Sequence, residues 1–154
     1  MGKLVVSACL LGRCCKYNGG SNRSEAVLRY VQGREVIAVC PEQLGGLPTP
    51  RCPAEIVQGV VTNKEGINVD REFRAGAAKA LAIAKENGVE LAILQYRSPS
   101  CGVKEIYDGT FYGTKIPGQG VFAKMLMDEG IRVLDAGELP KMILKNEDGK
   151  CQSD

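Results

Sequence analysis

Short apolar runs alternate with helical patterns along this chain, and this alternation constrains its fold more than any other feature. Residues 3–8, 35–39, 90–95 and 131–134 have the composition of buried strands. Strands that alternate with helices predict a parallel sheet with right-handed crossover connections. We therefore expect a single-domain, three-layer α/β sandwich around a mainly parallel, Rossmann-like sheet.

The intervening segments predict the remaining elements. Helical patterns cover residues 24–32, the stretch that Asp70 caps and Gly88 ends, residues 121–130 and a short helix at 138–145. Residues 55–69 predict a hairpin with its turn at 63–66. Two long loops are expected: a proline-rich one at 40–53 and a glycine-rich one at 109–120. The domain then spans residues 1–145, and the polar tail at 146–154 is expected to be disordered.

Length and charge limit the classes of function. A chain of 154 residues is long enough for one core and too short for two ordinary domains. The net charge of +2, with both signs interspersed, gives no reason to expect a nucleic acid or an anionic membrane as partner. The apolar runs are far shorter than the roughly 20 residues of a membrane span. We expect a cytoplasmic protein.

The chain has seven cysteines and no histidine. An odd number of cysteines, without a secretion signal, argues against a disulfide framework and favours metal or redox chemistry. The absence of histidine removes the commonest zinc ligand and the commonest general base. Any proton transfer must therefore use a carboxylate, a lysine, a tyrosine, a cysteine or water.

Three of these cysteines follow predicted strands: Cys9, Cys40 and Cys101. Because the carboxyl ends of parallel strands share one crevice, we expect the three thiols to meet and to hold a metal or a cluster. The alternative is that each is a small buried hydrophobic residue. Three protein ligands would leave an open coordination position, whereas a fourth thiolate would make the site structural. That fourth thiolate could come from Cys14, Cys15 or Cys52.

Two loops carry the other candidate residues. After Cys40, Glu42 is the best placed carboxylate for acid–base work, and Gly45 and Gly46 permit close approach to a ligand. Arg51 in the same loop could orient a carbonyl or a carboxylate. Glu42 and Arg51 could equally be ordinary solvated charges.

The second loop precedes Cys101. Ser98 and Ser100 place two hydroxyls beside the thiol, where they could bind an anion or relay a proton. The alternative is a capped turn in which these hydroxyls bond to the backbone.

Five motifs, in matching order from about Ser7 to Leu134, resemble the DUF523 family, whose characterised branch consists of thiouracil desulfurases. They are Ser7-Ala8-Cys9-Leu10-Leu11-Gly12; Cys15-Lys16-Tyr17-Asn18-Gly19; Cys40-Pro41-Glu42 with Gly45-Gly46-Leu47, Arg51 and Pro53; Ser98-Pro99-Ser100-Cys101-Gly102; and Ile106-Tyr107-Asp108-Gly109-Thr110-Phe111.

This resemblance implies a [4Fe–4S] cluster that three cysteines hold, with the fourth iron open to substrate. By motif the ligands would be Cys9, Cys40 and Cys101. The implied reaction replaces the sulfur of a thiolated pyrimidine, such as 2- or 4-thiouracil, by water and gives uracil and sulfide. Glu42 and either Ser98 or Ser100 would be the acid–base partners, and the substrate would be a small thio-compound.

Two other functions remain open from the residues alone. A cysteine persulfide sulfurtransferase would need no cluster and would depend on one thiol, for which Cys101 is the candidate. A non-enzymatic zinc or redox-sensing module would use four ligands, including Cys15 or Cys52.

Overall fold

The computed structural model describes residues 3–141, and a parallel sheet of four strands forms its centre. The strands are β1 (Leu4–Ser7), β2 (Val36–Val39), β5 (Leu91–Leu94) and β8 (Arg132–Asp135), in the order β2-β1-β5-β8. β1 lies between β2 and β5, with Val5 in register with Ile37 and Ala92. The expected α/β fold with a mainly parallel sheet is confirmed.

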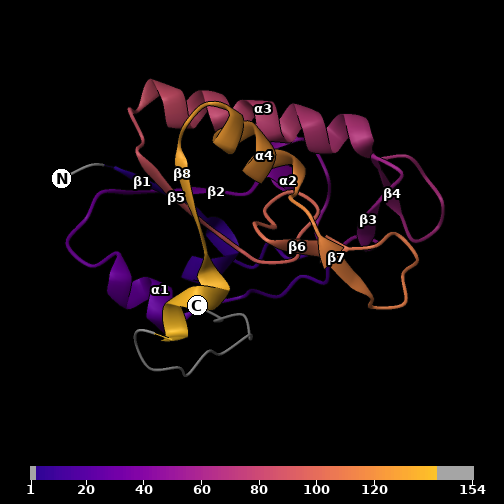
Figure 1. Ribbon diagram of the computed structural model, residues 1–154, viewed down its shortest axis with the longest axis horizontal. Helices are drawn as coiled ribbons and strands as arrows, with labels where there is room; N and C mark the ends of the chain where they lie inside the picture. Colours follow the sequence, from indigo (N-terminus) through magenta and orange to yellow (C-terminus); the bar gives the residue numbers. More distant parts are fainter. Residues whose placement is uncertain (1–2, 142–154) are drawn as a thin grey trace.

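Helices cover both faces of the sheet (Figure 1). One face carries α3 (Asp70–Glu86) and α4 (Val121–Asp128), and the other carries α1 (Glu25–Tyr30). Two 3-10 helices, η1 (Ala8–Leu11) and η2 (Ala136–Lys141), follow β1 and β8. No helix among residues 3–141 is long and apolar enough to cross a membrane. The part of the expected C-terminal helix after Lys141, and the expected disordered tail, lie outside the described residues.

Side chains alternate between the two faces, as a buried strand requires. In β1, Val5 packs in the cluster under α3 and α4, whereas Leu4 and Val6 pack against α1. In β5, Ala92 and Leu94 join the first cluster in the same way. The strand residues are apolar on both faces because both faces are covered.

Asp70 begins α3 rather than capping it, so the expected N-cap is wrong. Its carboxylate is engaged elsewhere: Oδ1 accepts the Val61 amide at 3.0 Å, and Oδ2 accepts Arg74 Nε at 2.7 Å. Val69 occupies the N-cap position without a side-chain cap. Asp70 therefore ties the start of α3 to β4 (Val60–Asn63).

This tie predicts a pH dependence of stability. Burial raises the pKa of Asp70, but hydrogen bonds from Arg74 and Val61 outweigh burial and lower the pKa below its usual value. The ionised carboxylate therefore stabilises the fold above the unfolded pKa of about 3.9, and this contribution is lost as pH falls through the folded pKa. Asp70→Asn should lower the free energy of unfolding by about 1 kcal/mol at pH 7. The deficit should shrink in urea titrations at about pH 3, and an equal deficit at both pH values would contradict this role.

Two hairpins lie together at one end of the molecule (Figure 1). β3 (Ala54–Val57) pairs with β4 through a turn at residues 58–59. The expected turn at 63–66 is also present, after β4, and an antiparallel bridge between Thr62 and Asn68 closes it. Gln58 and Gly59 both have positive φ, which is the geometry of a tight hairpin turn. The second hairpin pairs β6 (Glu105–Tyr107) with β7 (Lys115–Pro117), so part of the expected glycine-rich loop is a strand.

The expected loop at 40–53 contains a short helix, α2 (Pro41–Leu44), that packs closely against α3. A Cβ atom on Gly45 would lie 2.0 Å from the Glu72 carbonyl oxygen. A Cβ atom on Gly76 would lie 1.8 Å from the Pro41 carbonyl oxygen. The two glycines thus allow backbone-to-backbone contact, which sets the position of α2.

Gly76→Ala should therefore destabilise the protein, although alanine is the better helix former. Without the clash the substitution would add about 1 kcal/mol of helix propensity; with it, we expect a loss of about 1–3 kcal/mol in urea unfolding. Ala78→Gly, at an exposed position of the same helix, measures the difference in helix propensity between alanine and glycine without a packing clash. A Gly76→Ala variant as stable as the wild type would show that the contact between α2 and α3 can relax at no cost.

Candidate active site

A cavity of about 430 Å³ opens at the carboxyl ends of β1, β2 and β5. The connections from β1 and β5 run in opposite directions across the sheet, so this position is the switch point where open α/β sheets bind ligands. The chemically active side chains in its wall come from four segments and include Cys9, Cys15, Cys40, Glu42, Arg51, Glu55, Arg97, Ser98 and Cys101.

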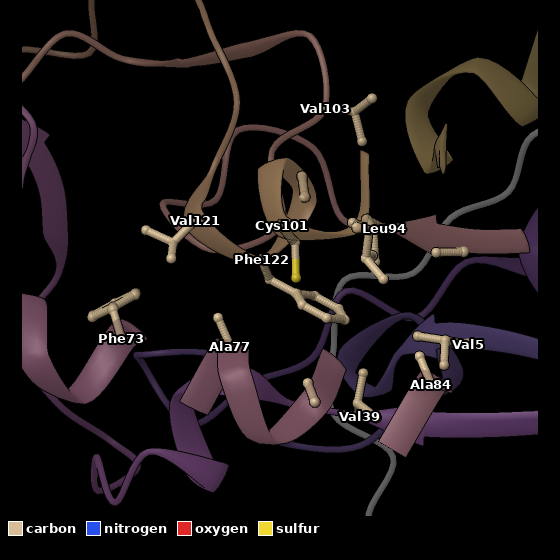
Figure 2. Packing of buried hydrophobic residues seen from close by; sticks show 14 of the residues in the cluster. Val5, Val39, Phe73, Ala77, Ala84, Leu94, Cys101, Val103, Val121 and Phe122 are labelled. Atoms are coloured by element: carbon tan, nitrogen blue, oxygen red, sulfur yellow. The ribbon is translucent and has the colours of Figure 1, made fainter. Parts of the chain in front are cut away.

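All three cysteines expected at the strand ends line this cavity. Cys9 lies in η1 directly after β1, and Cys40 is the N-cap residue of α2 directly after β2. Cys101 is buried in the turn that follows β5, and Figure 2 shows its sulfur beside the ring of Phe122. The structure therefore brings together thiols that are far apart in the sequence.

A fourth cysteine, Cys15, belongs to the same region. It is 4% exposed and packs with Cys40, and Cys9 lies against this pair. Cys14 and Cys52, the other two candidates for a fourth ligand, do not line the cavity. Cys15 was one of three equal candidates because spacing alone does not say which cysteine of the first loop points inward.

The thiols are not arranged around a single metal ion. Within residues 3–141 no group of three or more cysteine, aspartate or glutamate side chains could hold one. Tetrahedral zinc with Zn–S bonds of about 2.3 Å would need the thiolates roughly 3.8 Å apart. An iron–sulfur cluster places each cysteine on a different iron, so its ligands lie farther apart than those of one ion.

Glu42 connects the two loops of the site. It is 9% exposed in the first turn of α2, and its Oε2 accepts Ser100 Oγ at 2.6 Å. Cys40 Sγ donates to Oε1 at 3.6 Å. Arg51 Nη2 lies 3.9 Å from Oε2 and offsets the buried negative charge. A buried carboxylate with these partners, on the wall of a cavity, is well placed to accept a proton.

The two serines have different environments. Ser98 Oγ accepts the backbone amides of Ser100 and Cys101, both at 3.0 Å, so it mainly holds the turn together. Ser100 is fully buried, and its hydroxyl donates to Glu42 and lies 3.9 Å from Cys101 Sγ. The capped-turn alternative therefore describes Ser98, which also lines the cavity, whereas Ser100 does not line it but makes the shorter contact with Glu42.

Local contacts change the acidity of two thiols in opposite directions. A hydrogen bond from Cys15 lowers the pKa of Cys9 more than burial raises it, and the Asn22 amide, 3.4 Å from the sulfur, lowers it further. Burial raises the pKa of Cys101 well above its usual value, and the charge of Glu42 adds to this rise. Burial therefore disfavours the thiolate form of Cys101. Asn22 was missed because a lone asparagine in a loop carries no sequence signal.

The residues expected to bind substrate separate into two groups. Arg51 lines the cavity, and its buried Nε and Nη1 atoms have no hydrogen-bond partner among the described residues. Unpaired buried donors are costly, so they favour a ligand oxygen at this position. Gly45 and Gly46 do not line the cavity, and Gly45 instead contacts α3.

Aromatic side chains complete the wall. Tyr17, Tyr96 and Tyr107 line the cavity, and the guanidinium of Arg97 lies 4.7 Å from the centroid of the Tyr96 ring. Such surfaces suit a planar ligand. Isolated tyrosines in separate loops gave no pattern from which this wall could have been predicted.

Comparison with known proteins identifies the family of this chain. Residues 4–138 match the model of the 2-thiouracil desulfurase family. The chain is 42% identical over 146 residues to the uncharacterized protein YbbK of Bacillus subtilis (strain 168), an alignment that covers 88% of this chain and 97% of that protein. The fold of the present chain is similar to that of the [4Fe-4S]-dependent thiouracil desulfidase TudS (DUF523Vcz), with a TM-score of 0.85 and 40% sequence identity. This match covers 94% of the present chain and 97% of the TudS chain. The resemblance to DUF523 is thereby confirmed, and the chain belongs to the 2-thiouracil desulfurase family.

Proposed function

We propose that the protein is an iron–sulfur-dependent desulfurase that hydrolyses a thiolated pyrimidine such as 2- or 4-thiouracil. The observation that carries this proposal is the meeting of Cys9, Cys40 and Cys101 with Glu42 in one cavity. Family membership and the similarity to TudS support it. In the overall reaction water converts C=S to C=O and releases hydrogen sulfide, so no net electron transfer is needed.

The residues present fit a [4Fe–4S] cluster. Cys9, Cys40 and Cys101 offer three sulfur ligands in a buried pocket, and three ligands leave one of four irons without a cysteine. The Asn22 amide donates to Cys9 Sγ, as amides around cluster sulfurs do. When bound, the cluster would supply an iron Lewis acid with affinity for sulfur.

The protein residues then divide the remaining tasks. Glu42 takes a proton from the attacking water at Oε2, and this proton leaves with the sulfur as hydrogen sulfide. The hydroxyl of Ser100 donates to the same carboxylate at 2.6 Å and holds it in position. The guanidinium of Arg51 donates from its unpartnered Nη1 to the carbonyl oxygen of the substrate. Arg51 also places a positive charge 3.9 Å from Oε2 of Glu42, which offsets the charge of this carboxylate.

The cavity also favours a particular kind of substrate. Its walls combine aromatic rings with a few convergent polar groups, as small-molecule sites do. A net charge of +2 does not indicate the basic surface with which proteins bind the phosphate backbone of a nucleic acid. We therefore propose a small thio-compound as the partner and a cytoplasmic location, where thiols stay reduced.

Metal analysis with an activity assay tests this function. After anaerobic purification and reconstitution we expect about four iron and four acid-labile sulfide per chain. The same sample should convert 2- or 4-thiouracil to uracil and release one sulfide per turnover. Stoichiometric zinc, or no metal after reconstitution, would favour the zinc or persulfide alternatives instead.

A further inference from the structure

The proposed chemistry leaves one wall of the cavity unexplained, the turn between β6 and β7. Tyr107, the last residue of β6, and Gly113 in the turn both line the cavity. Residues 106–111 are also one of the motifs by which the sequence resembles its family. The turn contains no group that the reaction needs, so its role lies in shaping the site.

A second buried carboxylate, Glu55 of β3, contacts this turn. Glu55 is 9% exposed and also lines the cavity. Its Oε1 accepts the backbone amide of Gly109 at 2.9 Å and that of Phe111 at 3.1 Å. Two backbone N–H groups that converge on one carboxylate oxygen form a small anion-binding nest. Hydrogen bonds to an ionised acceptor are about twice as strong as neutral ones.

The backbone of the turn is built for this contact. Gly109 has φ 95°, and a Cβ atom there would lie 2.9 Å from the Ile56 carbonyl oxygen, so glycine allows the turn to approach β3. Phe111 has φ 64°, which is uncommon for a residue other than glycine and is kept only where contacts hold it. The amide of Phe111 is one of the two that Glu55 accepts.

Apart from the close approach of Gly109 to β3, the other hydrogen bonds of the turn among the described residues are internal to it. Asp108 donates its amide to the Thr114 carbonyl at 2.9 Å, and its Oδ1 accepts the amide and the hydroxyl of Thr110. These bonds preserve the shape of the turn but do not attach it to the rest of the cavity. Glu55 makes that attachment.

We propose that Glu55 is a positioning residue that fixes the turn at residues 107–113 as a wall of the substrate cavity and thereby sets how tightly substrate binds. This proposal rests on the proposed desulfurase function, but its structural part is independent of turnover. Glu55 is distinct in role from Glu42, because its carboxylate bonds to backbone amides rather than to the serine and cysteine of the reacting region.

The test compares three variants of the full chain. Glu55→Ala removes both hydrogen bonds, and Glu55→Gln keeps an amide oxygen that can accept them. Asn63→Ala is the matched control: Asn63 Oδ1 likewise accepts two loop amides, those of Glu65 and Ile67, in a turn that does not line the cavity. Circular dichroism and iron content establish that each variant is folded and loaded.

Amide hydrogen exchange reports the attachment without any turnover. In Glu55→Ala the amides of Gly109 and Phe111 should exchange at least about tenfold faster than in the wild type. Glu55→Gln should restore most of the protection, and Asn63→Ala should affect only its own turn. Unchanged exchange at Gly109 and Phe111 would overturn the proposal even if the enzyme is inactive on every thiouracil.

Steady-state kinetics report the consequence for binding. For Glu55→Ala with 2- or 4-thiouracil as substrate we expect KM to rise about tenfold and kcat to stay within about twofold. Glu55→Gln should lie near the wild type. A fall in kcat with KM unchanged would overturn the positioning role in favour of a catalytic one, and kinetics like those of Asn63→Ala would show that the turn does not affect substrate binding. Failure of the wild type to turn over thiouracil would instead count against the desulfurase function.

Discussion

Glu42→Gln is expected to lower kcat for thiouracil by about 10²–10⁴-fold, the usual contribution of a general base. The amide is nearly isosteric with the carboxylate and can still accept the Ser100 hydroxyl, but it cannot take a proton from water. Iron and sulfide content should stay at the wild-type level, because Glu42 is not a proposed ligand. Anaerobic sulfide release, together with iron analysis of the same sample, measures both quantities.

Two comparisons sharpen this experiment. Glu65→Gln makes the same charge change in an exposed loop and should leave kcat unchanged. Ser100→Ala should reduce kcat more than Ser98→Ala, because Ser100 contacts Glu42 at 2.6 Å and Ser98 at 3.5 Å. Wild-type kcat in Glu42→Gln would remove Glu42 from the mechanism and leave water or another side chain as the base.

Serine in place of Cys9, Cys40 or Cys101 is expected to abolish both cluster binding and turnover. Serine keeps the approximate size of cysteine, but its hydroxyl is a poor substitute for the soft thiolate that iron–sulfur clusters take. Each variant should reconstitute with far less than the wild-type iron and show no sulfide release above background. Visible absorbance after anaerobic reconstitution and iron analysis check this result.

Two further thiols among the described residues supply the controls. Cys52→Ser should match the wild type, because Cys52 does not line the cavity. Cys15→Ser is the more informative control, because Cys15 packs with Cys40 and Cys9 lies against this pair. If Cys9, Cys40 and Cys101 alone bind the cluster, the Cys15→Ser variant should keep its iron. Loss of metal in this variant would indicate a fourth ligand and a closed site, as the zinc alternative requires.

The features predicted correctly from sequence depend on short-range pattern and simple topology. Val5 and Ala92 lie in apolar runs that could only be buried strands, and parallel strands necessarily present their carboxyl ends together. This reasoning from the sequence is enough to predict that Cys9, Cys40 and Cys101 meet in one cavity. The position of Glu42 in the wall of the same cavity can be predicted too, because Glu42 lies two residues after Cys40.

The features missed depend on contacts between segments far apart in sequence. The Gly45-Gly46 pair was predicted to approach a ligand, but Gly45 approaches Glu72 of α3, which no local pattern reveals. Aspartate is a typical N-cap residue, yet the carboxylate oxygens of Asp70 accept hydrogen bonds from Val61 and Arg74 instead. Glu55 likewise has ordinary neighbours in the chain, and its partners are more than fifty residues away.

The position of the three thiols would also determine when the proposed cluster can enter. Cys9 and Cys40 follow neighbouring strands, but Cys101 comes after β5, which pairs with the other side of β1. A growing chain that has left the ribosome only as far as β5 therefore has two of the three thiols. It also lacks the hairpin of β6 and β7, which follows β5 in the chain. Insertion of the proposed cluster would need Cys101 as well, so it would follow the pairing of β5 with β1.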